Sequence, residues 1–163
     1  MTRQTPAPEY GFTLTEVVVT LAVAAVIAAL ALPSLSSFNR NGLVKHAAND
    51  MVATLSYARS EAINRNAPVS VVAAGTWSAG WQVSVAGTTL RQTTLNGAVA
   101  VAGPAGNTVT YNPNGRLATL ATVIFTFTLP GDAQVTMRCV SATLMGQPVL
   151  QADNNHDGNC SNG

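Results

Sequence analysis

Few residues in this chain could support catalysis. The two histidines, His46 and His156, lie far apart in the sequence. The sequence has no nucleophile elbow, phosphate-binding loop or HExxH motif, which are the patterns that hold a nucleophile, a phosphate or a zinc ion. It therefore predicts a protein that is not an enzyme and that needs no cofactor and no small-molecule substrate.

The C-terminal tail carries a cluster of side chains with oxygen ligands. Asp153, Asn155 and Asp157, followed by Gly158, match the first half of a calcium-binding loop. The bidentate glutamate that closes such a loop would fall one position past the end of the sequence. A polar turn closed by Cys160 is therefore the favoured interpretation, and a calcium site is the weaker one.

Two cysteines, Cys139 and Cys160, lie near the C-terminus. In a chain that crosses or leaves a membrane, an even number of cysteines predicts a disulfide. Two free thiols are the alternative, which an oxidising compartment disfavours. A metal site is a weak alternative, because the sequence has no CxxC motif and its histidines lie far apart.

The longest apolar stretch covers residues 12–32 and contains one charged residue, Glu16. As a helix that rises about 1.5 Å per residue, it would span about 32 Å, enough to cross a bilayer. A carboxylate is rarely tolerated in such a span and marks a functional position. The whole chain is 47% hydrophobic and 9% charged, with a net charge of +1. No overall charge therefore draws it to nucleic acid or to anionic lipid.

One long helix is expected to carry this stretch. Residues 1–11 are polar and contain two prolines, as a leader would. We expect a helix over residues 12–67 that spans the membrane over 12–32, kinks or pauses at Pro33 and is amphipathic over 34–66. Spacings of three and four residues define its predicted buried face, which comprises Val44, Ala48, Met51, Leu55, Ala58 and Ala62.

From residue 68 onward the hydrophobic period changes to two, which predicts an antiparallel β domain over residues 68–163. Trp77 and Trp81 are expected in the core and at the rim of its sheet. Turns rich in Gly, Pro and Asn separate the expected strands, which cover 69–72, 81–85, 88–92, 99–102, 108–111, 122–129 and 134–139. The fold class is therefore α+β, with the C-terminal disulfide closing a loop of the β domain.

The apolar run begins with a short motif, GFTLTE at residues 11–16, which resembles the class III signal of type IV prepilins. The resemblance implies cleavage between Gly11 and Phe12 by a prepilin peptidase that also N-methylates Phe12. Glu16 would then be the fifth residue of the mature chain. Its implied role is assembly, in which it pairs with the new α-amino group of a neighbouring subunit.

A second resemblance covers the middle of the chain. The segment SYARSEAINRN at residues 56–66, GWQV at 80–83 and YNPNGR at 111–116 resemble the GspH/FimT family of minor pilins and pseudopilins. The resemblance implies a type IV pilin-like fold and a structural subunit of a type II secretion pseudopilus or a type IV pilus, which supports protein secretion or pilus biogenesis. It also implies other pilins as partners and a single-pass location in the bacterial inner membrane, with the C-terminal domain in the periplasm.

A DNA-binding minor pilin for natural transformation is one alternative. Family members of that kind carry a C-terminal Gly-Arg-x-Arg motif, where this chain has only Gly146-Gln147-Pro148. Arg116 is a weak candidate for a DNA contact. Because the β domain is neutral and has no basic stripe, we expect nucleic acid not to be a partner.

A secreted soluble domain with an ordinary signal peptide is the other alternative. Ala29-Leu30-Ala31 fits its cleavage pattern, but Glu16 inside the apolar run argues against it.

Arg3 precedes the run, whereas Arg40 and Lys45 follow it. This distribution of cations does not support the orientation that the pilin resemblance implies.

Overall fold

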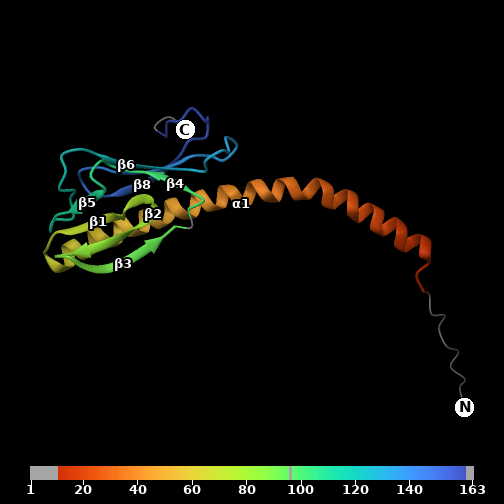
Figure 1. The fold of residues 1–163 in the computed structure, drawn as a ribbon, viewed down its shortest axis with the longest axis horizontal. Coiled ribbons are helices and arrows are strands. Elements are labelled where there is room, and N and C mark those ends of the chain that lie inside the picture. Colours follow the sequence, from red (N-terminus) through yellow and green to blue (C-terminus); the bar gives the residue numbers. More distant parts are fainter. Residues whose placement is uncertain (1–10, 96, 161–163) are drawn as a thin grey trace, which may run out of the picture. The chain divides into compact units, whose positions relative to one another are not determined.

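The N-terminal part of the chain forms one long helix, α1, which covers Leu14–Arg65 in the computed structural model (Figure 1). The structure describes residues 11–95 and 97–160, without the side chains of residues 30–36. Of the predicted leader, all but Gly11 lies outside the described residues. The helix continues through Pro33 without a break.

The chain divides into two compact units, residues 1–36 and residues 37–163. In the first unit the described side chains are exposed, including large apolar ones such as Leu14 and Leu21. Over the described residues, no helix is both long and apolar enough to cross a membrane. The last side chains of the expected span over 12–32, those of residues 30–32, are not described. The membrane span therefore stays a prediction.

In the second unit, α1 has a fully buried apolar face. The six residues that the helical period selected are all inaccessible to solvent, namely Val44, Ala48, Met51, Leu55, Ala58 and Ala62. Glu61 and Arg65 form an ion pair one turn apart, outside this buried face. The predicted amphipathic helix is therefore confirmed in this unit.

A Schellman motif ends α1. The amide of Asn66 donates to the carbonyl of Ile63, and the amide of Ala67 donates to the carbonyl of Ala62. Asn66 takes a left-handed conformation with φ of 49°, which asparagine tolerates better than most residues. Pro68 follows and cannot continue the helix, so the chain turns directly into the first strand.

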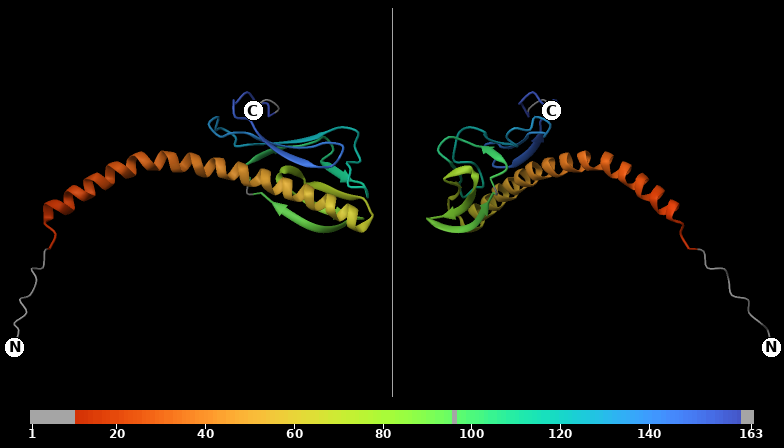
Figure 2. Two further views of the ribbon diagram at one scale, coloured as in Figure 1. Left: turned by 180° about the vertical axis from the view of Figure 1, so that it is seen from behind. Right: turned by 45° about the vertical axis from the view of Figure 1, so that its right-hand side comes forward.

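Two four-stranded antiparallel sheets complete this unit. The first sheet has the order β3-β2-β1-β5 and consists of β1 (Val69–Ala74), β2 (Thr76–Val85), β3 (Thr88–Thr94) and β5 (Thr108–Tyr111). The second sheet has the order β4-β6-β7-β8 and consists of β4 (Ala100–Ala102), β6 (Val123–Thr128), β7 (Arg138–Ala142) and β8 (Pro148–Ala152). Both sheets lie beside the C-terminal part of α1 (Figures 1 and 2).

Aromatic side chains join the two sheets and the helix. Trp77 of β2 packs edge to face on Phe125 of β6, with ring centroids 4.8 Å apart. Trp81 makes the same kind of contact with Phe127, and its indole nitrogen donates to the hydroxyl of Thr54 on α1 at 2.9 Å. Both tryptophans are buried, so neither is a rim residue.

Three expectations about the strands need correction. The last expected strand, 134–139, is observed as β7 at Arg138–Ala142, and β8 was not expected at all. The segment before β7 makes hydrogen bonds to side chains instead of a ladder, since Asn41 accepts from the amide of Thr136 and Asp132 accepts from the amide of Gln134. β2 also begins earlier than expected, at Thr76.

Candidate assembly site at the start of the helix

The helix begins with a capping box built from Thr13 and Glu16. The backbone amide and the hydroxyl of Thr13 donate to Oε2 of Glu16 at 2.9 and 2.8 Å. In return the amide of Glu16 donates to the Thr13 hydroxyl at 3.3 Å. This reciprocal arrangement satisfies amides at the first turn that have no helical partner. It places the capping residue, Thr13, two residues after Gly11 and the first helical residue, Leu14, three residues after it.

The predicted cleavage junction lies just outside this helix. Gly11 and Phe12 have no regular secondary structure, and both are exposed. A β-carbon built on Gly11 would meet no atom within 4 Å. The backbone between Gly11 and Phe12 is thus open to an enzyme that must approach it closely.

Glu16 is exposed and belongs to no ion pair among the described residues. It lines a shallow hollow of about 380 Å³ with Phe12, Val17 and Thr20. The carboxylate therefore stands one turn from the expected new N-terminus with an apolar side chain on each side. This arrangement can offer a negative charge to a second chain.

The C-terminal tail is closed by the predicted disulfide, Cys139–Cys160, which ties β7 to the last described residue. The Asp153 carboxylate beside it is buried and accepts hydrogen bonds from the amides of Asp157 and Gly158. Asp157 in turn accepts from the side chain of Asn155. Backbone amides thus occupy both oxygens of Asp153, as expected for the polar turn.

The described part of the chain contains no candidate metal site. No group of three or more His, Cys, Asp or Glu side chains there could hold an ion. The two histidines are exposed, His46 on α1 and His156 in the tail turn.

The candidate DNA contact, Arg116, is exposed on the turn after β5. Its guanidinium lies 3.0 Å from the sulfur of Met145. On the other side of the same turn, Nε of Arg59 donates to the carbonyl of Gly115. In the sequence, Arg59 is only one residue of the segment 56–66 that carries the family resemblance. It lies 56 positions before Gly115, and no pattern in the sequence indicates this contact.

The comparisons with known proteins agree with the geometry at both ends of the helix. The profile of the family described as type II transport protein GspH matches residues 47–146. The prokaryotic N-terminal methylation motif matches residues 7–32, the segment that contains the capping box. No curated protein sequence matches the chain at a significant level.

Solved structures of pilin-like proteins share the fold. The type IV minor pilin FimU of Pseudomonas aeruginosa is 24% identical in one crystal form, with a TM-score of 0.58 over 68% of this chain and 97% of FimU. A second crystal form gives 23% identity and a TM-score of 0.61 over 72% of this chain and 97% of FimU. The minor pseudopilin EpsH of the Vibrio cholerae type 2 secretion system is 16% identical, with a TM-score of 0.54 over 68% of this chain and 98% of EpsH.

The long helix, the antiparallel sheets and the N-terminal motif define a pilin-like protein, a structural subunit of a pilus or pseudopilus. The GspH profile covers well over half of the chain, and the chain belongs to the GspH family. Both the family and the fold are those of structural proteins.

Proposed function

We propose that this chain is a minor subunit that enters a type II secretion pseudopilus or a type IV pilus through its N-terminal helix. A prepilin peptidase cuts between Gly11 and Phe12 and methylates the new amino group. The subunit has no catalytic activity of its own. The N-terminal methylation motif over residues 7–32 is the observation that carries this proposal.

Before assembly, residues 12–32 anchor the chain in the inner membrane and the unit over residues 37–163 lies in the periplasm. Exposed apolar side chains along the described part of this segment support the anchor, since they find no partner within their own unit. Their burial in lipid, and later against other pilin helices, is favourable in proportion to the area removed from water.

Glu16 selects the register of assembly. Cleavage creates an ammonium group at Phe12, which is unfavourable in an apolar surrounding unless an anion compensates it. The Glu16 carboxylate of a neighbouring subunit is this anion. Because Glu16 caps its own helix before assembly, it exchanges hydrogen bonds with Thr13 for a charged partner.

Intact mass spectrometry of the chain extracted from membranes tests the processing step. The expected mass is that of residues 12–163 with one methyl group. A Gly11→Ala variant, which hinders peptidase access without changing the apolar segment, should keep the leader. A wild-type chain that begins at Leu32 would instead show an ordinary signal peptide and would refute the proposal.

A further inference from the structure

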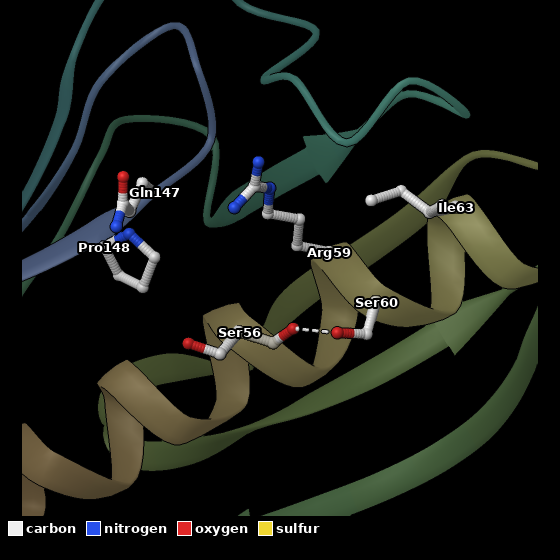
Figure 3. A pocket seen from close by; sticks show the side chains of 6 residues that line it. All are labelled: Ser56, Arg59, Ser60, Ile63, Gln147 and Pro148. Carbon is white, nitrogen blue, oxygen red and sulfur yellow. Dashed lines mark hydrogen bonds between the residues drawn. The ribbon is translucent and has the colours of Figure 1, made fainter.

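A small polar pocket of about 260 Å³ lies between α1 and the start of β8 (Figure 3). Its floor comes from one face of α1, because the contributing residues are spaced by three and four positions. Gln147 and Pro148 form the opposite wall. The lining comprises Ser56, Arg59, Ser60, Ile63, Gln147 and Pro148, of which only Arg59 is charged.

The Arg59 guanidinium is held in place but not neutralised. Its Nε donates to the carbonyl of Gly115 at 3.0 Å, and the side chain is half-buried. Among the described residues Arg59 forms no ion pair, while Glu61 is engaged by Arg65 and Asp132 by Arg40. The two terminal nitrogens of the guanidinium therefore remain as charged donors.

The wall of the pocket is fixed by two close backbone approaches. Gly115 has a φ of +71°, and a β-carbon there would lie 2.6 Å from Cδ1 of Ile63. Gly146, with a φ of +75°, packs so closely that a β-carbon would lie 2.2 Å from the Gly115 carbonyl oxygen. The Gly115 carbonyl that orients Arg59 is thus itself locked, which preorganises the donors and lowers the cost of binding.

We infer that this pocket binds a carboxylate, namely an acidic side chain of a neighbouring filament subunit. A guanidinium whose Nε is occupied still presents two parallel N–H groups to the two oxygens of a carboxylate. The Ser56 hydroxyl and the Gln147 amide can donate further hydrogen bonds. The Ser60 hydroxyl already donates to the Ser56 carbonyl at 3.0 Å (Figure 3). One arginine in a small recess suits a single side chain better than a nucleic-acid backbone, which needs several cations. The identity of the occupant rests on the proposed function.

The first test measures the site on the purified full chain in detergent, independently of assembly. Acetate is titrated at constant ionic strength while the amide resonances of Ser60 and Gln147 are followed by NMR. We expect saturable shifts, at least tenfold weaker binding in Arg59→Gln, and an intermediate loss in Arg59→Lys, which keeps the charge but not the fork. Arg91→Gln, which removes an arginine from β3, should bind acetate like the wild type.

Three results of this titration would overturn the inference. They are shifts that do not saturate, equal acetate binding by the folded Arg59→Gln variant, or saturation by inorganic phosphate at a tenfold lower concentration than acetate. The last result would assign the pocket to a phosphate instead.

The second test identifies the occupant in cells that assemble the filament. A photoreactive phenylalanine derivative replaces Gln147, with the same replacement of Gln92 on β3 as the control. We expect a cross-link from position 147 to another filament subunit, on a peptide that contains Asp or Glu, reduced at least fivefold by Arg59→Gln. Cross-linking of equal yield in both backgrounds would refute the subunit as occupant. Because acetate binding needs no filament, its result separates a failure of the pocket from a failure of the proposed function.

Discussion

At the scale of single residues, Glu16 has two competing uses. Within one chain it completes a capping box with Thr13, which stabilises the helix start. Between chains it would compensate the ammonium group of a neighbour. A glutamine at the same position could keep the capping hydrogen bond but not the charge. This difference allows the two uses to be measured separately.

Gly146 is predicted to contribute strongly to the stability of the fold. An alanine there would be strained by its φ of +75°, at about 1–2 kcal/mol, and its β-carbon would overlap the Gly115 carbonyl. Overpacking adds about 1–3 kcal/mol. Gly131→Ala is the matched control, because its φ is +80° but nothing lies within 4 Å. Urea unfolding of both variants checks this, and equal destabilisation would contradict the close packing.

Tyr111 is predicted to make the fold sensitive to high pH. Burial raises the pKa of its phenol to about 12, although the Arg59 cation acts in the opposite direction. Folding therefore favours the neutral phenol. The contribution of Tyr111 to the free energy of unfolding is fully present below pH 10, the ordinary pKa of the phenol, and is lost as the pH rises through 12.

Tyr111→Phe tests this dependence. The hydroxyl is buried and has no hydrogen-bond partner among the described residues, so we expect nearly unchanged stability at pH 7. The alkaline unfolding midpoint should move to higher pH. A loss of stability of more than about 1 kcal/mol at pH 7 would show instead that the hydroxyl makes a stabilising hydrogen bond.

At the scale of elements, the end of α1 offers a direct prediction. Asn66 occupies the left-handed position of the Schellman motif, where glycine has no steric penalty. Asn66→Gly should therefore stabilise the chain by up to about 1 kcal/mol, and Asn66→Ala should destabilise it by about the same amount. Thermal unfolding of the two variants checks the order, and the opposite order would contradict this helix end.

The elements that sequence reasoning placed correctly have strong local signals. The buried face of α1 follows from the 3.6-residue period, because helix geometry alone places Val44, Ala48 and Met51 on one side. β8 has no such signal. It is an edge strand whose residues alternate between half-buried and exposed, and it begins with a proline. The bounds of β7 were wrong because the side chain of Asn41, far away in the sequence, accepts a hydrogen bond from the amide of Thr136.

The candidate site divides in the same way. The N-terminal motif could be predicted because its residues are contiguous, and the structure adds the capping box that the motif encodes. The disulfide followed from the number of cysteines. The Arg59 pocket could not be predicted, because Arg59 and Gly115 are 56 positions apart and meet only when the turn after β5 packs on α1.

At the scale of the whole molecule, the Cys139–Cys160 disulfide is predicted to hold the tail to the second sheet. The bridge closes a loop with a sequence separation of 21, which corresponds to about 3 kcal/mol in the chain-entropy model. The double variant Cys139→Ser, Cys160→Ser should lose about this much in urea unfolding. Alkylation of the wild type without reduction should label neither cysteine, and labelling of both would contradict the bridge.

Incorporation of Glu16 variants into filaments tests the central claim most directly. Wild type, Glu16→Ala, Glu16→Gln and Glu16→Asp are expressed at equal levels, and the fraction of each that co-purifies with sheared filaments is measured. Glu61→Ala is the matched control, because it removes a carboxylate that is paired with Arg65 within the chain. Intact mass confirms that each variant is processed.

We predict normal incorporation of Glu61→Ala and a loss of about a hundredfold or more for Glu16→Ala and Glu16→Gln. Deleting one partner of a buried ion pair costs about 3–5 kcal/mol. Glu16→Asp should be intermediate, since it keeps the charge at shorter reach. Incorporation of processed Glu16→Gln at the wild-type level would contradict the account, because it would leave Glu16 with a capping role alone.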